Sequence, residues 1–304
     1  MTAASVLFDA PGPRARIRDR LLTAATVVVA LLLAWVVYTK LAEKGQLDAA
    51  KWEPFLNPNV WKTYLLPGIR GTLTAAAVSI VLALVLGFAL GVGRLSRHPA
   101  VRRPCAVIVE FFRAVPVLIM MIFAFAVFAI YDVFPSTNLA LAAVITGLTL
   151  YNGAVIAEIV RAGVNALPSG QSEAAWALGL QWGQTMRSIL LPQAITSMLP
   201  VLISQLVVVL KDTAIGYQIT FVELVRQGRN VGSAFGNYIP ALIVVAILMI
   251  SVNFTLSYLA TWLERRLRRS GRGAAPMDTG AVEQEGAPGA GANLAVIGDQ
   301  SSSR

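Results

Sequence analysis

Long apolar runs alternate with short polar stretches along this 304-residue chain. A helix needs about 20 residues to cross the ~30 Å hydrocarbon core of a bilayer. Six runs are long enough, namely 21–39, 72–92, 107–131, 139–157, 188–210 and 238–263. Only the third run contains charges, Glu110 and Arg113, and both lie in its first two turns. The pattern predicts an all-α polytopic membrane protein with six transmembrane helices.

The stretch between the fourth and fifth runs, residues 173–192, reads EAAWALGLQWGQTMRSILLP. Its alanines favour a helix, and Gly179 can adopt the left-handed conformation that ends one. A second, amphipathic helix over 180–191 should stop at Pro192, which lacks a backbone N–H. Small Ala174 and Ala175 would let another protein approach the helix backbone, with Glu173 adding charge near the helix start. We expect a compact docking segment, although a polar connector with an alanine-rich turn would share this pattern.

Composition and charge support a membrane location. The chain is 56% hydrophobic and 13% charged, with a mean hydropathy of +0.67, which is outside the range of soluble globular proteins. The net charge of +9 could suggest nucleic acid, but the basic residues cluster beside apolar runs without a soluble domain to present them. The positive-inside tendency instead places both termini and the 173–192 segment in the cytoplasm.

Few residues suit chemistry on covalent bonds. Cys105 and His98 are the only cysteine and histidine, so an internal disulfide is excluded and a metal cluster is not expected. No GxxxxGK[ST] run occurs, so the chain lacks a P-loop nucleotide site of its own. If the protein uses ATP, another chain must bind it.

The sequence divides into five regions. Residues 1–20 form a polar, basic cytoplasmic lead, and 21–39 form an additional N-terminal transmembrane anchor, since no small-residue cleavage site follows. Residues 40–67 form an extracellular interfacial segment rich in aromatic side chains. Residues 68–263 form the main membrane domain. Residues 264–304 form a cytoplasmic tail, expected to be disordered because few large apolar side chains could offset its ordering entropy.

Several polar residues fall within or at the ends of apolar runs, where an unpaired polar group is costly. They can border a path for solute or can serve local structure, and an i,i+3 salt bridge is the favoured role of the pair Glu158 and Arg161. Candidates for the path are Tyr151, Asn152, Glu158, Arg161, Gln205, Lys211, Asp212 and Thr213.

The spacing within 173–192 carries a resemblance to a known family. Glu-Ala-Ala, three residues, Gly179, nine residues, Ile189, one residue, then Leu191 and Pro192 resembles the cytoplasmic signature loop of ABC importer permeases. Residues 110–116 are similar to the E-x-F-R-x-x-P segment of that family. Residues 151–163 and the L-K-D-T run at 210–213 resemble its polar amino-acid branch. The resemblance covers about 68–263, and 52–67 with FRAVPVLIMMIFA, LYNGAVIAEI, SILLPQA and LKDTAIGYQI looks closest to glutamate uptake permeases.

This resemblance implies a type I ABC importer permease fold with a cytoplasmic EAA coupling helix, in the plasma membrane of a prokaryote. The residues it assigns to coupling are Glu173, Ala174, Ala175, Gly179, Ile189 and Pro192. The implied partners are two copies of an ATPase, which hold ATP and Mg, an extracellular amino-acid-binding protein, and a second homologous permease, favoured as a related chain. The chain itself would hold no cofactor and would not be an enzyme.

Other functions remain open from the residues alone. A secondary transporter or channel would also carry polar residues within its spans, but it would not need a small-residue docking helix and would often show repeated halves. A structural scaffold would tolerate the spans without explaining the EAA spacing. Within the importer family, glutamine or aspartate is the alternative substrate.

Overall fold

The computed structural model describes residues 12–270, and this part of the chain is helical throughout apart from short connections. The long helices are α1 (Pro13–Glu43), α4 (Leu66–Arg94), α5 (Pro99–Ala114), α6 (Val117–Ile130), α7 (Ser136–Asn165), α10 (Leu191–Asp212), α11 (Leu224–Phe235) and α12 (Tyr238–Ser270). The short ones are α2 (Ala49–Trp52), α3 (Pro58–Val60), α8 (Ser169–Ala177) and α9 (Trp182–Thr185). Glu53–Leu56 and Thr213–Ile219 are 3-10 turns, and Trp61–Leu65 and Met186–Leu190 are π segments.

Five continuous helical stretches of the described residues are long and apolar enough to cross a membrane. They are Pro13–Glu43, Pro58–Arg94, Ser136–Asn165, Trp182–Ile219 and Tyr238–Trp262, and a bent pair, α5 with α6, brings the number to six if it counts as one span. The all-helical, polytopic fold expected from hydropathy is therefore confirmed.

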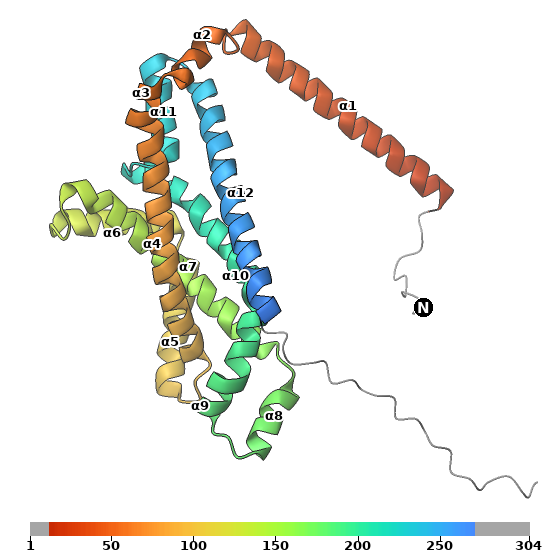
Figure 1. Ribbon diagram of the computed structural model, residues 1–304, viewed down its shortest axis with the longest axis vertical. Coiled ribbons are helices and arrows are strands. Elements are labelled where there is room, and N and C mark those ends of the chain that lie inside the picture. The colour runs from red at the N-terminus through yellow and green to blue at the C-terminus, as the bar shows by residue number, and fades with distance from the viewer. Residues whose placement is uncertain (1–11, 271–304) are drawn as a thin grey trace, which may run out of the picture.

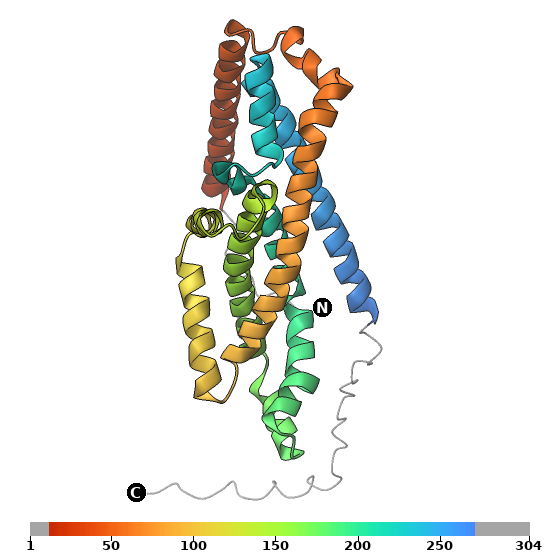
Figure 2. The ribbon, with the colours of Figure 1, turned by 90° about the vertical axis from the view of Figure 1, so that its left-hand side faces the viewer.

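The third expected span, 107–131, is not one helix. It breaks between α5 and α6, whose axes are bent by 100°, and Figure 2 shows α6 end-on beside α5. Val115 is extended at φ −83° and ψ 127°, the conformation that a following proline favours. Pro116 lacks the N–H that would continue the helix. The apolar run concealed this break because hydropathy does not register a change of direction.

Pro192 does not end the helix that precedes it, contrary to the sequence prediction. Helical structure begins at α9, where Gln181 and Gln184 form a capping box, and runs through the π segment Met186–Leu190 into α10. The segment Trp61–Leu65 precedes Pro67 in the same way. A π turn skips a hydrogen bond, and it thereby accommodates the missing N–H of a following proline.

Helices extend across several of the expected region boundaries, and the regions themselves stay a prediction. Helix α1 begins at Pro13, so residues 13–20 of the expected lead are helical. Residues 58–67 of the expected interfacial segment belong to the helix that continues into α4, and 264–270 of the expected tail extend α12. The rest of the lead, 1–11, and of the tail, 271–304, lies outside the described residues.

The body is built around α4 and α7, which pack together more extensively than any other pair in the described chain. Glycines allow this close approach: a Cβ on Gly87 would lie 2.5 Å from Ile156, and one on Gly91 would lie 2.8 Å from Val160. This agrees with the i,i+4 glycine spacing as a close-packing site.

The two ends of the body are made of different elements (Figure 1). Helices α8 and α9 lie at one end, whereas α2, α3 and α11 lie at the other. Helix α1 leaves the body at the α2 end, and none of its residues is buried. The segment expected to dock a partner is therefore presented at the end opposite the aromatic connecting segment.

Candidate functional site

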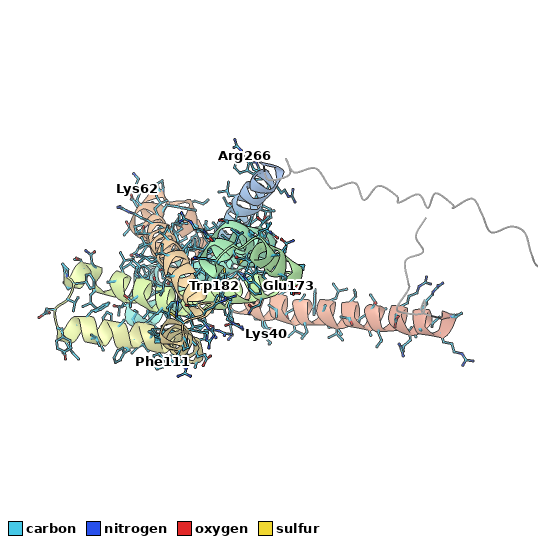
Figure 3. All side chains as sticks on the ribbon, turned by 90° about the horizontal axis from the view of Figure 1, so that it is seen from below. Lys40, Lys62, Phe111, Glu173, Trp182 and Arg266 are labelled. Atoms are coloured by element: carbon cyan, nitrogen blue, oxygen red, sulfur yellow. The ribbon has the colours of Figure 1, made fainter. Side chains whose placement is uncertain are left out.

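Helices α8 and α9 form this end of the molecule (Figure 1), and α8 ends where the sequence indicated. Gly179 has φ +76°, and the Leu180 N–H donates to the carbonyl of Ala175 at 3.1 Å. This bond from beyond the helix end, together with the left-handed glycine, forms a Schellman-type C-cap. The chain then reverses into α9, which contacts α8. Figure 3 views the molecule from this end, with Glu173 of α8 and Trp182 of α9 labelled.

Only part of the expected docking surface is exposed. Glu173 and Ala174 are exposed, but Ala175 is 1% exposed, on a helix that packs against α9 and the π segment. Ala175 therefore packs within this chain, and the expected coupling role of the segment stays a prediction. Trp176 and Leu178, at 47% and 80% exposure, present apolar surface that the sequence prediction missed.

Ile189 and Pro192 lie on the helix leading away from the tip. Ile189 is half-buried within the π segment, and Pro192 is exposed in the first turn of α10. Gln193 donates to Gln171 of α8 at 3.3 Å, which joins the start of α10 to the docking helix. The six residues assigned to coupling thus lie on one connected unit without forming one surface.

A cluster of charges lies where α4, α5 and α7 meet. The Glu158 carboxylate accepts hydrogen bonds from Arg94 at 2.5 Å and Arg161 at 2.5 Å, and lies 3.6 Å from Arg113. Glu110 pairs with Arg94 at 3.4 Å, not with its helical neighbour Arg113. The i,i+3 pair of Glu158 and Arg161 is confirmed, and the tertiary structure adds two arginines to it.

A polar cavity of about 430 Å³ opens at the break between α5 and α6. Four of its lining residues carry polar side chains: Arg113, Tyr151, Gln205 and Asp212. Asn152, completely buried behind them, accepts a hydrogen bond from Gln205 at 2.7 Å. A guanidinium and a carboxylate that line the same cavity can bind the two charged groups of a free amino acid. The guanidinium would pair with the α-carboxylate and the carboxylate with the α-ammonium group.

Two neighbouring candidates lie outside the cavity lining. Lys211 is exposed, and the buried Thr213 hydroxyl donates to the carbonyl of Leu210 at 2.7 Å. Glu158 and Arg161 lie in the charge cluster, which shares Arg113 with the cavity lining. The path candidates therefore separate into three groups: Tyr151, Asn152, Gln205 and Asp212 at the cavity, Glu158 and Arg161 in the charge cluster, and Lys211 and Thr213 outside both. Arg113 was not predicted as a path residue, and it connects two of these groups because it lines the cavity and lies beside Glu158.

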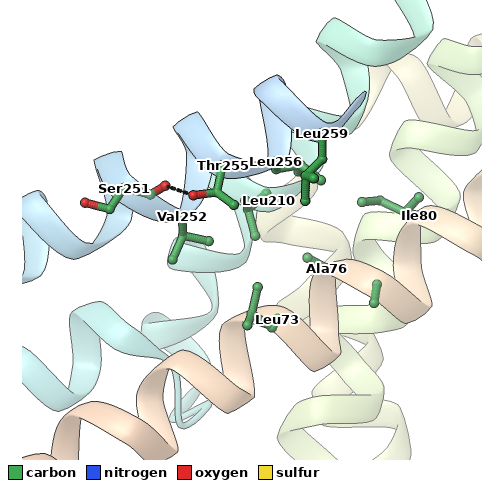
Figure 4. Close-up of a pocket in the computed structure, with 10 residues that line it drawn as sticks. Leu73, Ala76, Ile80, Leu210, Ser251, Val252, Thr255, Leu256 and Leu259 are labelled. Carbon is green, nitrogen blue, oxygen red and sulfur yellow. Dashed lines mark hydrogen bonds between the residues drawn. The ribbon is translucent and has the colours of Figure 1, made fainter. Parts of the chain in front are cut away.

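A second pocket, of about 430 Å³, lies between α4, α10 and α12 and is apolar (Figure 4). Its two hydroxyls already donate to their own helix: Ser251 to Ile247 at 2.8 Å and Thr255 to Ser251 at 2.8 Å. It offers no free polar group for a charged solute and is a poor candidate site. Within residues 12–270, no group of three His, Cys, Asp or Glu side chains could hold a metal ion.

Glu223, which the sequence prediction also missed, is completely buried at the start of α11. Its carboxylate accepts backbone N–H groups of Val225 at 2.7 Å and Arg226 at 2.6 Å. Burial nevertheless raises the pKa of Glu223 to about 7, although these hydrogen bonds oppose the shift. The sequence could have indicated Glu223 as an N-cap residue only if a helix had been predicted at 224–235.

Comparison with known proteins gives consistent matches. The family model for the inner membrane component of binding-protein-dependent transport systems matches residues 79–269. The chain is 58% identical over 228 residues to the glutamate transport system permease protein GluD of Corynebacterium glutamicum, covering 75% of this chain and 84% of that protein. It is 35% identical to the probable glutamine ABC transporter permease protein GlnP of Bacillus subtilis, covering 67% and 93%. A crystal structure of an amino acid ABC transporter with histidines matches with a TM-score of 0.62 and 28% identity, covering 70% of this chain and 98% of that one.

Proposed function

This chain belongs to the family of inner membrane components of binding-protein-dependent transport systems, and we propose that it is the permease subunit of a glutamate importer. As a polar amino-acid ABC permease it is a multi-pass inner membrane protein of bacteria and not the ATPase. The family implies an ATPase and a binding protein as partners. ATP and Mg then bind to two ATPase copies, and a related chain forms the second permease.

The observation that carries glutamate as the substrate is the 58% identity to GluD over 84% of its length. Another relative, at 35% identity, is named for glutamine, which makes glutamine the main competitor. The polar cavity supports a charged amino acid, because Arg113 and Asp212 border the same space. We assign Tyr151, Gln205 and Asp212 to substrate contact, with Asn152 holding Gln205 in place.

Coupling is assigned to α8. Its exposed face carries Glu173, Ala174, Trp176 and Leu178 at the end of the molecule farthest from α11. An ATPase that binds this face differently in its ATP-bound and nucleotide-free states would bias two arrangements of the membrane helices. In this orientation the tip and both termini are cytoplasmic, and the connecting segment with α2 and α3 is extracellular.

The experiment is uptake of labelled glutamate into proteoliposomes holding the complete complex, with ATP enclosed and binding protein outside. We expect uptake that requires ATP and is competed by glutamate more strongly than by glutamine or aspartate. Stronger competition by glutamine would overturn the assigned substrate. Uptake that persists without the ATPase subunit would instead indicate a secondary transporter and refute coupling.

The cavity is tested in the same system with Gln205→Leu, and the matched control is Ser204→Ala. Ser204 is an exposed neighbour whose hydroxyl donates to the carbonyl of Pro200. Gln205→Leu should raise the glutamate concentration at half-maximal uptake, because its amide borders the cavity and is held by Asn152. Equal behaviour of the two variants would remove the cavity from the substrate path.

A further inference from the structure

The exposed tryptophan of the docking helix contacts a second part of the chain. The guanidinium of Arg97, in the connection between α4 and α5, lies 5.0 Å from the centre of the Trp176 ring. This distance is within the range of a cation–π interaction. Helix α8 is thus joined to the α4–α5 connection, from which it is far removed in sequence.

The α4–α5 connection is short and tightly packed, so it can transmit displacement. Backbone hydrogen bonds from Leu95 to Val92 and from Ser96 to Gly93, both 3.1 Å, continue the end of α4 almost to Arg97. A Cβ on Gly93 would lie 2.5 Å from the sulfur of Cys105, so α4 and α5 meet there with no space between them. A shift of Arg97 is therefore passed to both helices.

From this connection a series of contacts leads to the polar cavity. Arg94, whose side chain is 10% exposed, binds Glu158 of α7. Glu158 in turn lies 3.6 Å from Arg113, and Arg113 lines the cavity. Helices α7 and α10 are connected to the docking unit through the chain itself, but α5 is not. Helix α5 supplies one wall of the cavity. This wall can move together with α8 only if noncovalent contacts connect the two helices.

We propose that Arg97 and Trp176 are positioning residues that couple the docking helix to the α5 wall of the cavity. This proposal rests on the proposed function, since it requires a motor that displaces α8. Trp176 moves with α8, and Arg97 transmits that displacement to α4 and α5. The ion pairs of Glu158 hold Arg94, Arg113 and α7 together as these helices move. The ring contact transmits motion and does not touch the solute.

The test uses the complete complex in proteoliposomes and measures glutamate transported per ATP hydrolysed. Arg97→Gln should lower this ratio about two- to fivefold, the contribution of an exposed cation–π contact to an equilibrium constant. Arg97→Lys, which keeps the cation, should retain most of the ratio. The matched control is Arg102→Gln, because Arg102 is an exposed arginine of α5 with no ion pair or ring contact within residues 12–270.

Trp176 is exposed and could also contact the ATPase, so the contact is isolated by a double-mutant cycle with Trp176→Leu. Arg97→Gln should have little further effect when Trp176 is already leucine. If Arg97→Gln lowered the ratio of glutamate transported to ATP hydrolysed by the same factor with and without Trp176, the proposal would be overturned. An Arg97→Gln ratio equal to that of Arg102→Gln would also overturn it. A wild-type complex without ATP-driven glutamate uptake would instead refute the proposed function, so the two failures are distinguishable.

Discussion

Replacing Gly179 with alanine should weaken binding of the ATPase, because this residue sets the direction in which the chain leaves the docking helix. Gly179 has φ +76°, and a Cβ at this position would have no atom within 4 Å. The substitution therefore adds backbone strain without steric clash. For an L-residue the left-handed conformation costs roughly 1–2 kcal/mol. That cost lowers the population of the native turn about 5- to 30-fold.

The chain offers two matched controls for this substitution. Gly170 in α8 and Gly183 in α9 also have open space where the methyl group of an alanine would lie, but their backbones are not left-handed. Alanine favours a helix over glycine by about 1 kcal/mol, so Gly170→Ala and Gly183→Ala should not weaken the turn. Gly179→Asn should lie between wild type and Gly179→Ala, because asparagine tolerates the left-handed conformation.

The assay is a titration of the ATPase subunit against the permease in nanodiscs, followed by ATP-driven uptake with the same variants. We expect an affinity loss of about 5- to 30-fold for Gly179→Ala and none for either control. If Gly179→Ala bound with wild-type affinity, the turn would not be required for docking. If all three alanine variants weakened binding equally, the effect would come from surface contact and not from backbone conformation.

Three further predictions concern stability and the first helix. Gly71→Ala should lower the Tm of the purified subunit, because its Cβ would clash with the carbonyl oxygen of Val222; an unchanged Tm would show that this loop moves freely. Burial raises the pKa of Glu223 from 4.5 to about 7. Between pH 4.5 and about 7 the folded protein therefore binds more protons than the unfolded chain, so its free energy of unfolding falls as pH rises through that window. Glu223→Gln should remove this part of the pH dependence of Tm, and an unchanged slope would contradict the assignment. Deletion of α1 should preserve ATP-driven uptake per inserted complex, since none of its residues is buried; loss of uptake by a correctly inserted complex would assign α1 a role in transport.

The prolines show where reasoning from sequence succeeds and where it stops. A proline removes one N–H wherever it occurs, but the consequence differs along this chain. Pro116 marks a 100° bend, whereas Pro104 and Pro200 lie inside continuous helices and Pro192 follows a π segment. The same missing N–H thus accompanies a sharp bend, an uninterrupted helix or a π segment, and the presence of a proline alone does not select among them.

The candidate site divides in the same way. Spacing alone predicts the pair of Glu158 and Arg161, because i,i+3 residues on a helix are neighbours whatever surrounds them. Arg94 is separated from Glu158 by 64 residues, so no local pattern could bring them together. The burial of Ala175 likewise depends on how α8 packs against the rest of the chain, which helix propensity does not specify.

Local patterns in the chain are enough to predict its apolar spans, the helix end at Gly179 and the i,i+3 ion pair. Each of these depends on hydropathy, backbone conformation or spacing within a few turns. The bend at Pro116, the charge cluster around Glu158 and the contact of Arg97 with Trp176 arise only when the helices pack. These features join segments distant in sequence, and their free energy is shared among helices whose relative positions no short pattern encodes.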